Sequence, residues 1–176
     1  METSKKEMSK NTKIKKKLKI QNIYTESILT RTLIVDIVDI DDNIKKTLES
    51  NLIKTIEGKC ICEGFIKPDS CKIISYSSGL ILNGNKIKFE VVFKCKICLP
   101  IEGMLIDCIA KNITKAGIKA EIDADITPVI IFIARDHHYS NENFSLVNEN
   151  DKITVRVIGQ KFELNDKYIS VIASLA

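Results

Sequence analysis

The sequence contains no tryptophan, and only 6% of its 176 residues are aromatic. Its apolar residues are therefore mainly β-branched, and isoleucine dominates them, which favours strands over helices. No apolar run approaches the roughly 20 residues that span a bilayer, and no hydrophobic signal-peptide core follows the lysines near residue 1. We expect an intracellular protein with more sheet than helix.

The usual catalytic motifs are also missing. We find no Walker loop, dinucleotide fingerprint, nucleophile elbow or zinc-protease helix. His137 and His138 follow Asp136, a combination that metal or general-base chemistry could use. No third nucleophile or paired carboxylate stands at a motif spacing, however, so we interpret this segment as a solvent-exposed loop. We expect no catalytic activity and no cofactor.

Six cysteines raise the question of a zinc site, because Cys95 and Cys98 have the spacing of a ligand pair and Cys60 lies close to Cys62. Cys95 and Cys98 lie in an alternating apolar run that indicates a strand. Residues three apart on a strand point to opposite faces, so this pair is poorly placed to hold one ion. We expect free, buried thiols and no metal.

The net charge is only +4, and much of the surplus lies in residues 1–20, which are rich in lysine. Such a run is typical of a solvated, disordered tail. Weak attraction to nucleic acid and a localisation signal are the alternatives.

The first half of the chain has the pattern of a mixed α/β unit. A strand is predicted at Thr32–Val38 and an amphipathic helix from Ile44 to Ile56, since apolar residues recur there every four positions. The predicted N-cap lies at Asp41–Asn43, and Gly58 follows the helix. Three further strands are predicted, at Lys59–Ile66, Lys72–Leu82 and Lys86–Cys98.

The second half has the pattern of a small antiparallel barrel. One domain is predicted to close at Pro100 and another to open at Gly103, where a long strand begins and folds back at Lys115–Gly117. A strand at 129–133, a polar loop at 135–150, and strands at 152–164 and 167–175 complete the set. Five strands with a long loop after the third fit an OB-type barrel, a fold that commonly binds oligonucleotides.

The order of these features resembles the seventh subunit of eukaryotic RNA polymerase II and its archaeal counterpart. The resemblance runs from about Leu29 to the C-terminus. It rests on residues 52–64, 79–81, 84–85, 89–100, 102–103, 112–122, 132–135, 157–159 and 165–166.

The resemblance implies an α+β fold: a ribonucleoprotein-like tip domain, one helix on an antiparallel sheet, at 21–100, and a C-terminal OB barrel at 101–176, after the basic tail at 1–20. It implies a non-catalytic stalk subunit of a multisubunit DNA-directed RNA polymerase. Its partners would be the large polymerase subunits, a fourth-subunit-like companion along both domains, and nascent RNA. The docking residues would be those of the tip loops: Ser78, Gly79, Leu80, Asn83, Gly84 and Asn85.

Strongly binding barrels of this type place aromatics beside the glycine of the second turn and a histidine after the third strand, where bases can stack. Ala116, Lys119 and Ala134 stand at those positions here, so we expect poor stacking and a salt-sensitive affinity based on charge. The candidate RNA contacts are Lys111, Lys115, Lys119, Arg135, His137, His138 and Lys161.

Two other classes of protein remain open. A free RNA-binding protein of translation or RNA decay would carry the same barrel, and a pure protein-interaction module would use the barrel only to hold partners. The Lys-, Ile- and Asn-rich composition indicates an AT-rich genome, such as that of a large DNA virus with its own polymerase. We therefore expect the protein in the nucleus if it is cellular, and in the virion or host-cell cytoplasm if it is viral.

Overall fold

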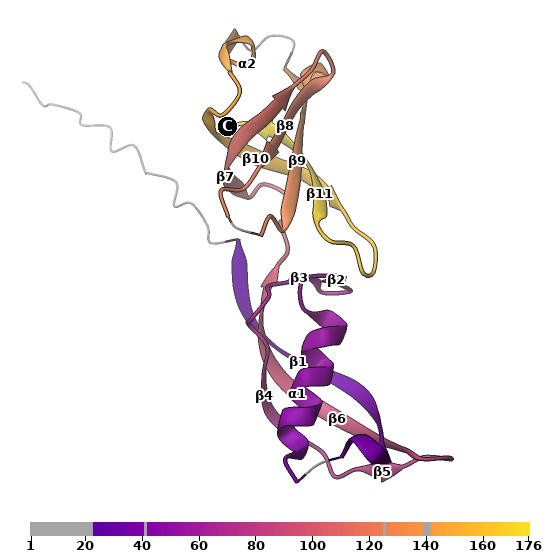
Figure 1. Ribbon diagram of the computed structural model, residues 1–176. Coiled ribbons are helices and arrows are strands. Elements are labelled where there is room, and N and C mark those ends of the chain that lie inside the picture. The colour runs from indigo at the N-terminus through magenta and orange to yellow at the C-terminus, as the bar shows by residue number, and fades with distance from the viewer. Residues whose placement is uncertain (1–22, 41, 125, 139–141) are drawn as a thin grey trace, which may run out of the picture.

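The structure is a computed structural model, which describes residues 23–40, 42–124, 126–138 and 142–176. A tip sheet with one helix and a closed barrel lie end to end (Figure 1). The fold class is therefore α+β with a barrel in the second half, as predicted. The basic tail at 1–20 lies outside the described residues.

Two long strands form the axis of the tip sheet. Strand β1 (Tyr24–Asp36) and strand β6 (Lys86–Cys98) pair antiparallel without a break, from Tyr24 opposite Cys98 to Asp36 opposite Lys86. β6 has the predicted bounds, whereas β1 begins eight residues before the predicted start at Thr32. Polar residues dominate its first half, so pairing with β6, rather than apolar alternation, accounts for this extension.

Helix α1 (Ile44–Ile56) covers one face of the tip sheet (Figure 1). The Asn43 side chain caps it by accepting a hydrogen bond from the Lys46 N–H at 3.3 Å. Leu48, Leu52 and Ile56 are buried against the sheet, which confirms the four-residue apolar spacing. A short 3₁₀ turn, η1 (Ile37–Asp39), lies between β1 and the helix.

The remaining strands of the tip sheet are shorter than predicted. The segment 59–66 forms a tight hairpin of β2 (Cys60–Ile61) and β3 (Gly64–Ile66), because Gly64 adopts a φ of 128°. The segment 72–82 divides into β4 (Lys72–Tyr76) and β5 (Leu80–Ile81), both paired with β6.

The barrel has five strands in the order β7-β8-β9-β11-β10, closed by pairing of β10 with β7. The β9 and β11 strands are parallel, and the other neighbours are antiparallel. This is the topology of an OB fold, with β7 as its first strand. The bounds are β7 Leu105–Ile113, β8 Gly117–Glu121, β9 Val129–Ala134, β10 Lys152–Lys161 and β11 Ile169–Leu175.

The segment between β9 and β10, predicted as a polar loop, contains two short helical elements. These are the 3₁₀ turn η2 (Arg135–His137) and helix α2 (Glu142–Leu146), at the end of the barrel far from the tip sheet (Figure 1). Phe144 of α2 is buried in the barrel core.

The two halves meet at the β2–β3 hairpin. The Cys60 N–H donates to the Asp166 carbonyl at 2.8 Å, and the Cys60 carbonyl accepts from the Asn165 N–H at 2.9 Å. Phe65 and Cys98, which are cross-strand neighbours, belong to the same buried cluster as the barrel interior. The barrel core therefore continues into the end of the tip sheet.

The cysteines are free, and five of the six are buried, with Cys62 exposed. Cys95 packs in the core under α1, whereas Cys98 packs in the core shared with the barrel. The two side chains thus point to opposite faces of β6, as predicted. Burial raises the pKa of the Cys98 thiol to about 12.

Candidate nucleic-acid interface and docking tip

The outer face of β8, β9 and β11 carries a row of three exposed side chains. Lys119 lies opposite Phe132, and Phe132 lies beside Ile172 on β11. Phe132 is 39% exposed, whereas Ile131 and Ile133 on either side of it point into the core and are fully buried. An aromatic and a cation therefore lie side by side on the face that OB folds use for oligonucleotides.

Phe132 is held in place by the glycine of the β7–β8 turn. A Cβ at Gly117 would lie 2.9 Å from Phe132 Cζ and would collide with the Ile133 carbonyl oxygen. The ring tip thus rests on the Gly117 backbone, which only a residue without a side chain allows. The sequence reasoning looked for an aromatic next to Gly117 along the chain and missed this one. The available signal was its place on β9, where Phe132 alternates with inward-facing Ile131 and Ile133.

Two predicted cations meet at the end of the barrel beyond this row. The Arg135 Nε donates to the Lys115 carbonyl at 2.9 Å, and its guanidinium carbon lies 5.0 Å from the Phe144 ring centroid. Arg135 therefore joins the β7–β8 turn to α2, while its side chain stays exposed to solvent.

The two predicted histidines have different environments. His137 is exposed, but His138 is only 7% exposed. Its Nδ1 lies 2.8 Å from the Ala134 carbonyl, and its Nε2 accepts a hydrogen bond from the Leu175 N–H at 2.9 Å. The ring also stacks on Phe144. Asp136 and His137 are thus exposed as expected, whereas His138 is buried, and we leave His138 out of the RNA contacts proposed below.

The other predicted cations are spread over the barrel. Lys119, which is exposed, forms an ion pair with the half-buried Glu121 at 3.1 Å. Lys161 pairs with Ser170 at the start of β11, so it lies at the opposite end of the face from Arg135. Lys111 is exposed on β7. The fold brings Lys115 and Arg135 together and leaves Lys111 and Lys161 apart from them.

The predicted docking residues lie at the end of the tip sheet far from the barrel, near β5 (Figure 1). Gly79 packs tightly, since a Cβ there would lie 2.6 Å from Ile87 Cγ2, whereas a Cβ at Gly84 would meet no atom within 4 Å. The Asn85 carbonyl accepts a hydrogen bond from the Ile37 N–H at 2.7 Å. Ser78, Leu80 and Asn83 are exposed.

Exposed apolar side chains surround these loops, and the sequence reasoning did not single them out. Leu80 is 60% exposed and Ile81 71% exposed. Their neighbours at this end are also exposed: Ile34, Ile37 and Val38. Ile34 and Leu80 face the same side of the sheet, since both pair with Lys88, whereas Ile81, which pairs with Ile87, faces the other side. Large apolar side chains exposed to water at one end of a sheet are typical of an interaction surface. We call these five residues the apolar tip.

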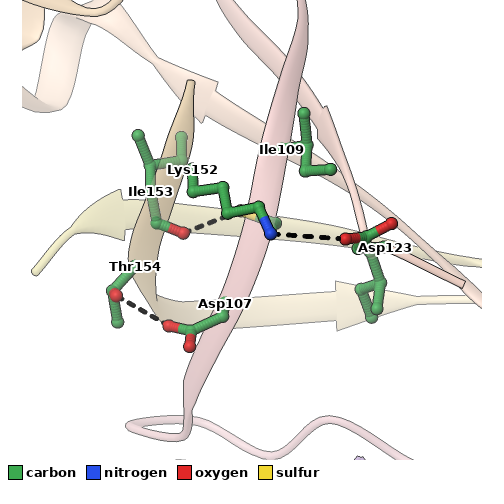
Figure 2. Close-up of a pocket in the computed structure, with 8 residues that line it drawn as sticks. Asp107, Ile109, Asp123, Lys152, Ile153 and Thr154 are labelled. Atoms are coloured by element: carbon green, nitrogen blue, oxygen red, sulfur yellow. Dashed lines mark hydrogen bonds and ion pairs between the residues drawn. The ribbon is translucent and has the colours of Figure 1, made fainter. Parts of the chain in front are cut away.

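A shallow cavity of about 370 Å³ lies at the β7–β10 pairing of the barrel (Figure 2). Its polar groups are bonded to each other: the Thr154 hydroxyl donates to Asp107 Oδ1 at 2.7 Å, and Lys152 Nζ lies 3.6 Å from Asp123 Oδ2. The Lys152–Asp123 pair is exposed at both side chains and therefore weak. Over the described ranges, no group of three or more His, Cys, Asp or Glu side chains is placed to hold a metal ion.

In the part of the chain that the structure describes, no helix has the length and apolar character needed to cross a membrane. No protein-family model matches the sequence.

Several curated proteins are similar to the chain, and two of them are RNA polymerase subunits. A protein of Acanthamoeba polyphaga mimivirus named as a DNA-directed RNA polymerase subunit is 29% identical over 149 residues, covering 76% of this chain and 72% of the relative. DNA-directed RNA polymerase II subunit 7 of Arabidopsis thaliana is 30% identical over 95 residues, covering 53% of this chain and 51% of the relative. These relatives confirm that the chain resembles the seventh-subunit family of RNA polymerase.

Proposed function

We propose that the chain is a non-catalytic stalk subunit of a multisubunit DNA-directed RNA polymerase, which docks on the enzyme core through its tip domain and contacts nascent RNA through its barrel. The observation that carries this proposal is the 149-residue similarity to a viral polymerase subunit. A match of that length is too long to lie within either half, so it includes parts of both the tip sheet and the barrel.

The apolar tip supports docking through the tip domain, residues 21–100 in this proposal. Leu80 and Ile81 lie on β5, a strand of only two residues at the end of the sheet. Burying a valine, leucine or isoleucine side chain contributes about 1.5–3 kcal/mol, so the five residues of the apolar tip would dominate a small interface. The large polymerase subunits are the partners proposed for this end.

The fold and charge of the barrel, residues 101–176, support the proposed contact with RNA. Its cations, Lys115, Lys119, Arg135 and Lys161, lie on or next to the face of β8, β9 and β11. Lys111 on β7 and His137 after Arg135 complete the proposed set. Lysine and arginine contacts to phosphates give affinity without sequence preference and make it sensitive to salt.

A groove of about 680 Å³ supports the proposal that a companion subunit binds along both halves. Its walls come from the first residues of β1, the end of β6 and the segment that enters the barrel. Ile23, Ile97, Leu99, Ile101 and Met104 make the groove largely apolar. A fourth-subunit-like partner that bridges the tip sheet and barrel would cover these side chains.

Affinity purification tests the proposal. The protein is tagged, isolated from its native source at moderate salt, and its partners are identified by mass spectrometry. If the chain is a polymerase subunit, the two large polymerase subunits should be recovered with it in near-equal amount. Recovery of RNA with ribosomal or decay factors, and no polymerase, would overturn the stalk assignment and favour a free RNA-binding protein.

A further inference from the structure

We propose that Phe132 and Ile172 form a stacking platform for one base of a single-stranded RNA, with the adjacent phosphate at Lys119. This inference rests on the proposed contact between the barrel and RNA, and it adds a specific base contact to the charge-based binding described above. Bases offer a π-face whatever their identity, so a platform of this kind binds RNA without a sequence preference.

The position of Phe132 supports this role. Phe132 is an outward-facing aromatic on a barrel whose interior is already filled by Ile131, Ile133 and other fully buried side chains. Its ring tip rests on Gly117, while 39% of the residue remains exposed. A ring that is already held in one place loses little conformational entropy when a base stacks on it.

The surroundings of the ring leave room for a base. Ile172 lies beside Phe132 and is 48% exposed, and the next residue in the row is Gly159 on β10. A Cβ at Gly159 would meet no atom within 4 Å. Gly159 itself therefore adds no side chain to this row, whereas its chain neighbour Ile158, at the β-bulge, is 41% exposed.

A phosphate partner lies next to the platform. Lys119 is directly opposite Phe132 in the antiparallel pair, where side chains are about 5 Å apart. Its ion pair with Glu121 is open to solvent at the lysine, whose side chain is 48% exposed, so a phosphate can compete for the ammonium group.

The size of the platform favours RNA over a protein partner. A stable protein interface buries about 800 Å² on each side, far more than one phenylalanine and one isoleucine supply. A single base matches their area, and the neighbouring lysine suits a polyanion better than an apolar protein surface. A protein partner would instead need the larger apolar tip or groove.

The absence of tryptophan allows a direct test. Phe132→Trp creates a single-tryptophan protein whose fluorescence reports on this site alone. Titration with a single-stranded oligouridine RNA should quench the fluorescence, and titration with the abasic sugar–phosphate analogue of that RNA should quench it much less. Tyr76→Trp, at a position of similar exposure on the tip sheet, is the matched control and should not respond.

Affinity measurements on the full chain complete the test. Phe132→Leu keeps an apolar side chain but loses the ring, and it should weaken RNA binding by about 5- to 150-fold, the range measured for single stacked bases. Its salt dependence should stay unchanged, whereas Lys119→Gln should reduce that dependence. Thermal melting verifies that each variant is folded.

Three results would overturn the proposal, and they lead to two different conclusions. If the original chain binds RNA and Phe132→Leu binds equally well, or if bound RNA does not quench the fluorescence of Phe132→Trp, the platform is wrong but the barrel still contacts RNA. If the original chain binds no RNA, the proposed RNA contact of the barrel fails together with the platform.

Discussion

The carbonyl oxygen of Cys60 accepts a hydrogen bond from the Asn165 N–H at 2.9 Å, across the boundary between the tip sheet and the barrel. The return bond, from the Cys60 N–H to Asp166, makes the β10–β11 turn pair with β2 as a neighbouring strand would. Phe65 and Cys98 fill the space between them and the barrel interior. The two halves therefore share backbone pairing and core, and we expect them to unfold together.

Phe65→Ala tests this shared core. Removing a fully buried phenylalanine should lower the free energy of unfolding by about 3–5 kcal/mol and separate the unfolding of the two halves. Urea denaturation followed by circular dichroism and by limited proteolysis measures both effects. Ile74→Ala, at an exposed position of β4, is the control and should change stability by less than about 0.5 kcal/mol. A single unchanged transition in Phe65→Ala would contradict the shared core.

The two adjacent histidines provide a matched pair of variants. His138→Ala leaves the Leu175 N–H and the Ala134 carbonyl without their partner, which should cost about 1–3 kcal/mol for each buried group that stays unsatisfied. His137→Ala removes an exposed ring and should have almost no effect on the melting temperature. Equal melting temperatures for the two variants would mean that the hydrogen bonds of His138 contribute nothing to the barrel.

Gly117 and Gly159 provide a second matched pair of variants, because the space around the two glycines differs. A methyl group at Gly117 would collide with the Ile133 carbonyl oxygen and press on Phe132, whereas one at Gly159 would meet nothing. Gly117→Ala should therefore destabilise the barrel by about 1–3 kcal/mol, as overpacking does, and Gly159→Ala should be close to neutral. Urea unfolding of both variants measures the difference, and comparable losses would contradict the close approach at Gly117.

Charges placed on the apolar tip should release the protein from polymerase. The double variant Leu80→Asp with Ile81→Asp should abolish recovery of the large subunits, because the carboxylates would be buried without partners in the interface. Leu164→Asp, 63% exposed on the barrel, is the control for an added charge at an exposed leucine. Co-purification followed by quantitative mass spectrometry reads out both. Full recovery of polymerase with the double variant would exclude docking through this surface.

The buried thiols should make the folded protein less stable at high pH. Burial raises the pKa of Cys98 and Cys108 to about 12, so the folded chain holds these protons more tightly than the unfolded chain, whose thiols ionise near pH 8.5. Their contribution to the free energy of unfolding is fully present below pH 8.5 and is lost as the pH rises towards 12. The urea midpoint should therefore fall between pH 7.5 and pH 10, and that of Cys98→Ala should fall less steeply. An unchanged midpoint at pH 10 would contradict this linkage.

Much of the fold could be read from local sequence signals. The bounds of β6 follow from the turn at Asn83–Asn85 and from Pro100, and α1 follows from its four-residue apolar spacing. The hairpin within 59–66 was missed because the segment was interpreted as one continuous strand, although Glu63 and Gly64 interrupt its apolar residues. Gly64 with its positive φ was the clue.

The candidate site was harder to predict, because it depends on register. The sequence places Phe132 on a strand, but only the pairing of β9 with β8 and β11 shows that it lies beside Lys119 and Ile172. The burial of His138 depends on Leu175, which lies 37 residues away along the chain. Neither relationship has a signature in the local sequence.

The uninterrupted pairing of β1 with β6 also fixes a length. Thirteen paired residues at about 3.3 Å each make a ribbon of roughly 43 Å, which starts beside the apolar tip and ends in the shared core below the barrel. In the proposed complex the length of this ribbon sets the distance between the polymerase surface and the RNA-binding face of the barrel. Inserting two residues into each strand would keep the inward and outward faces and move the barrel outward by about 7 Å.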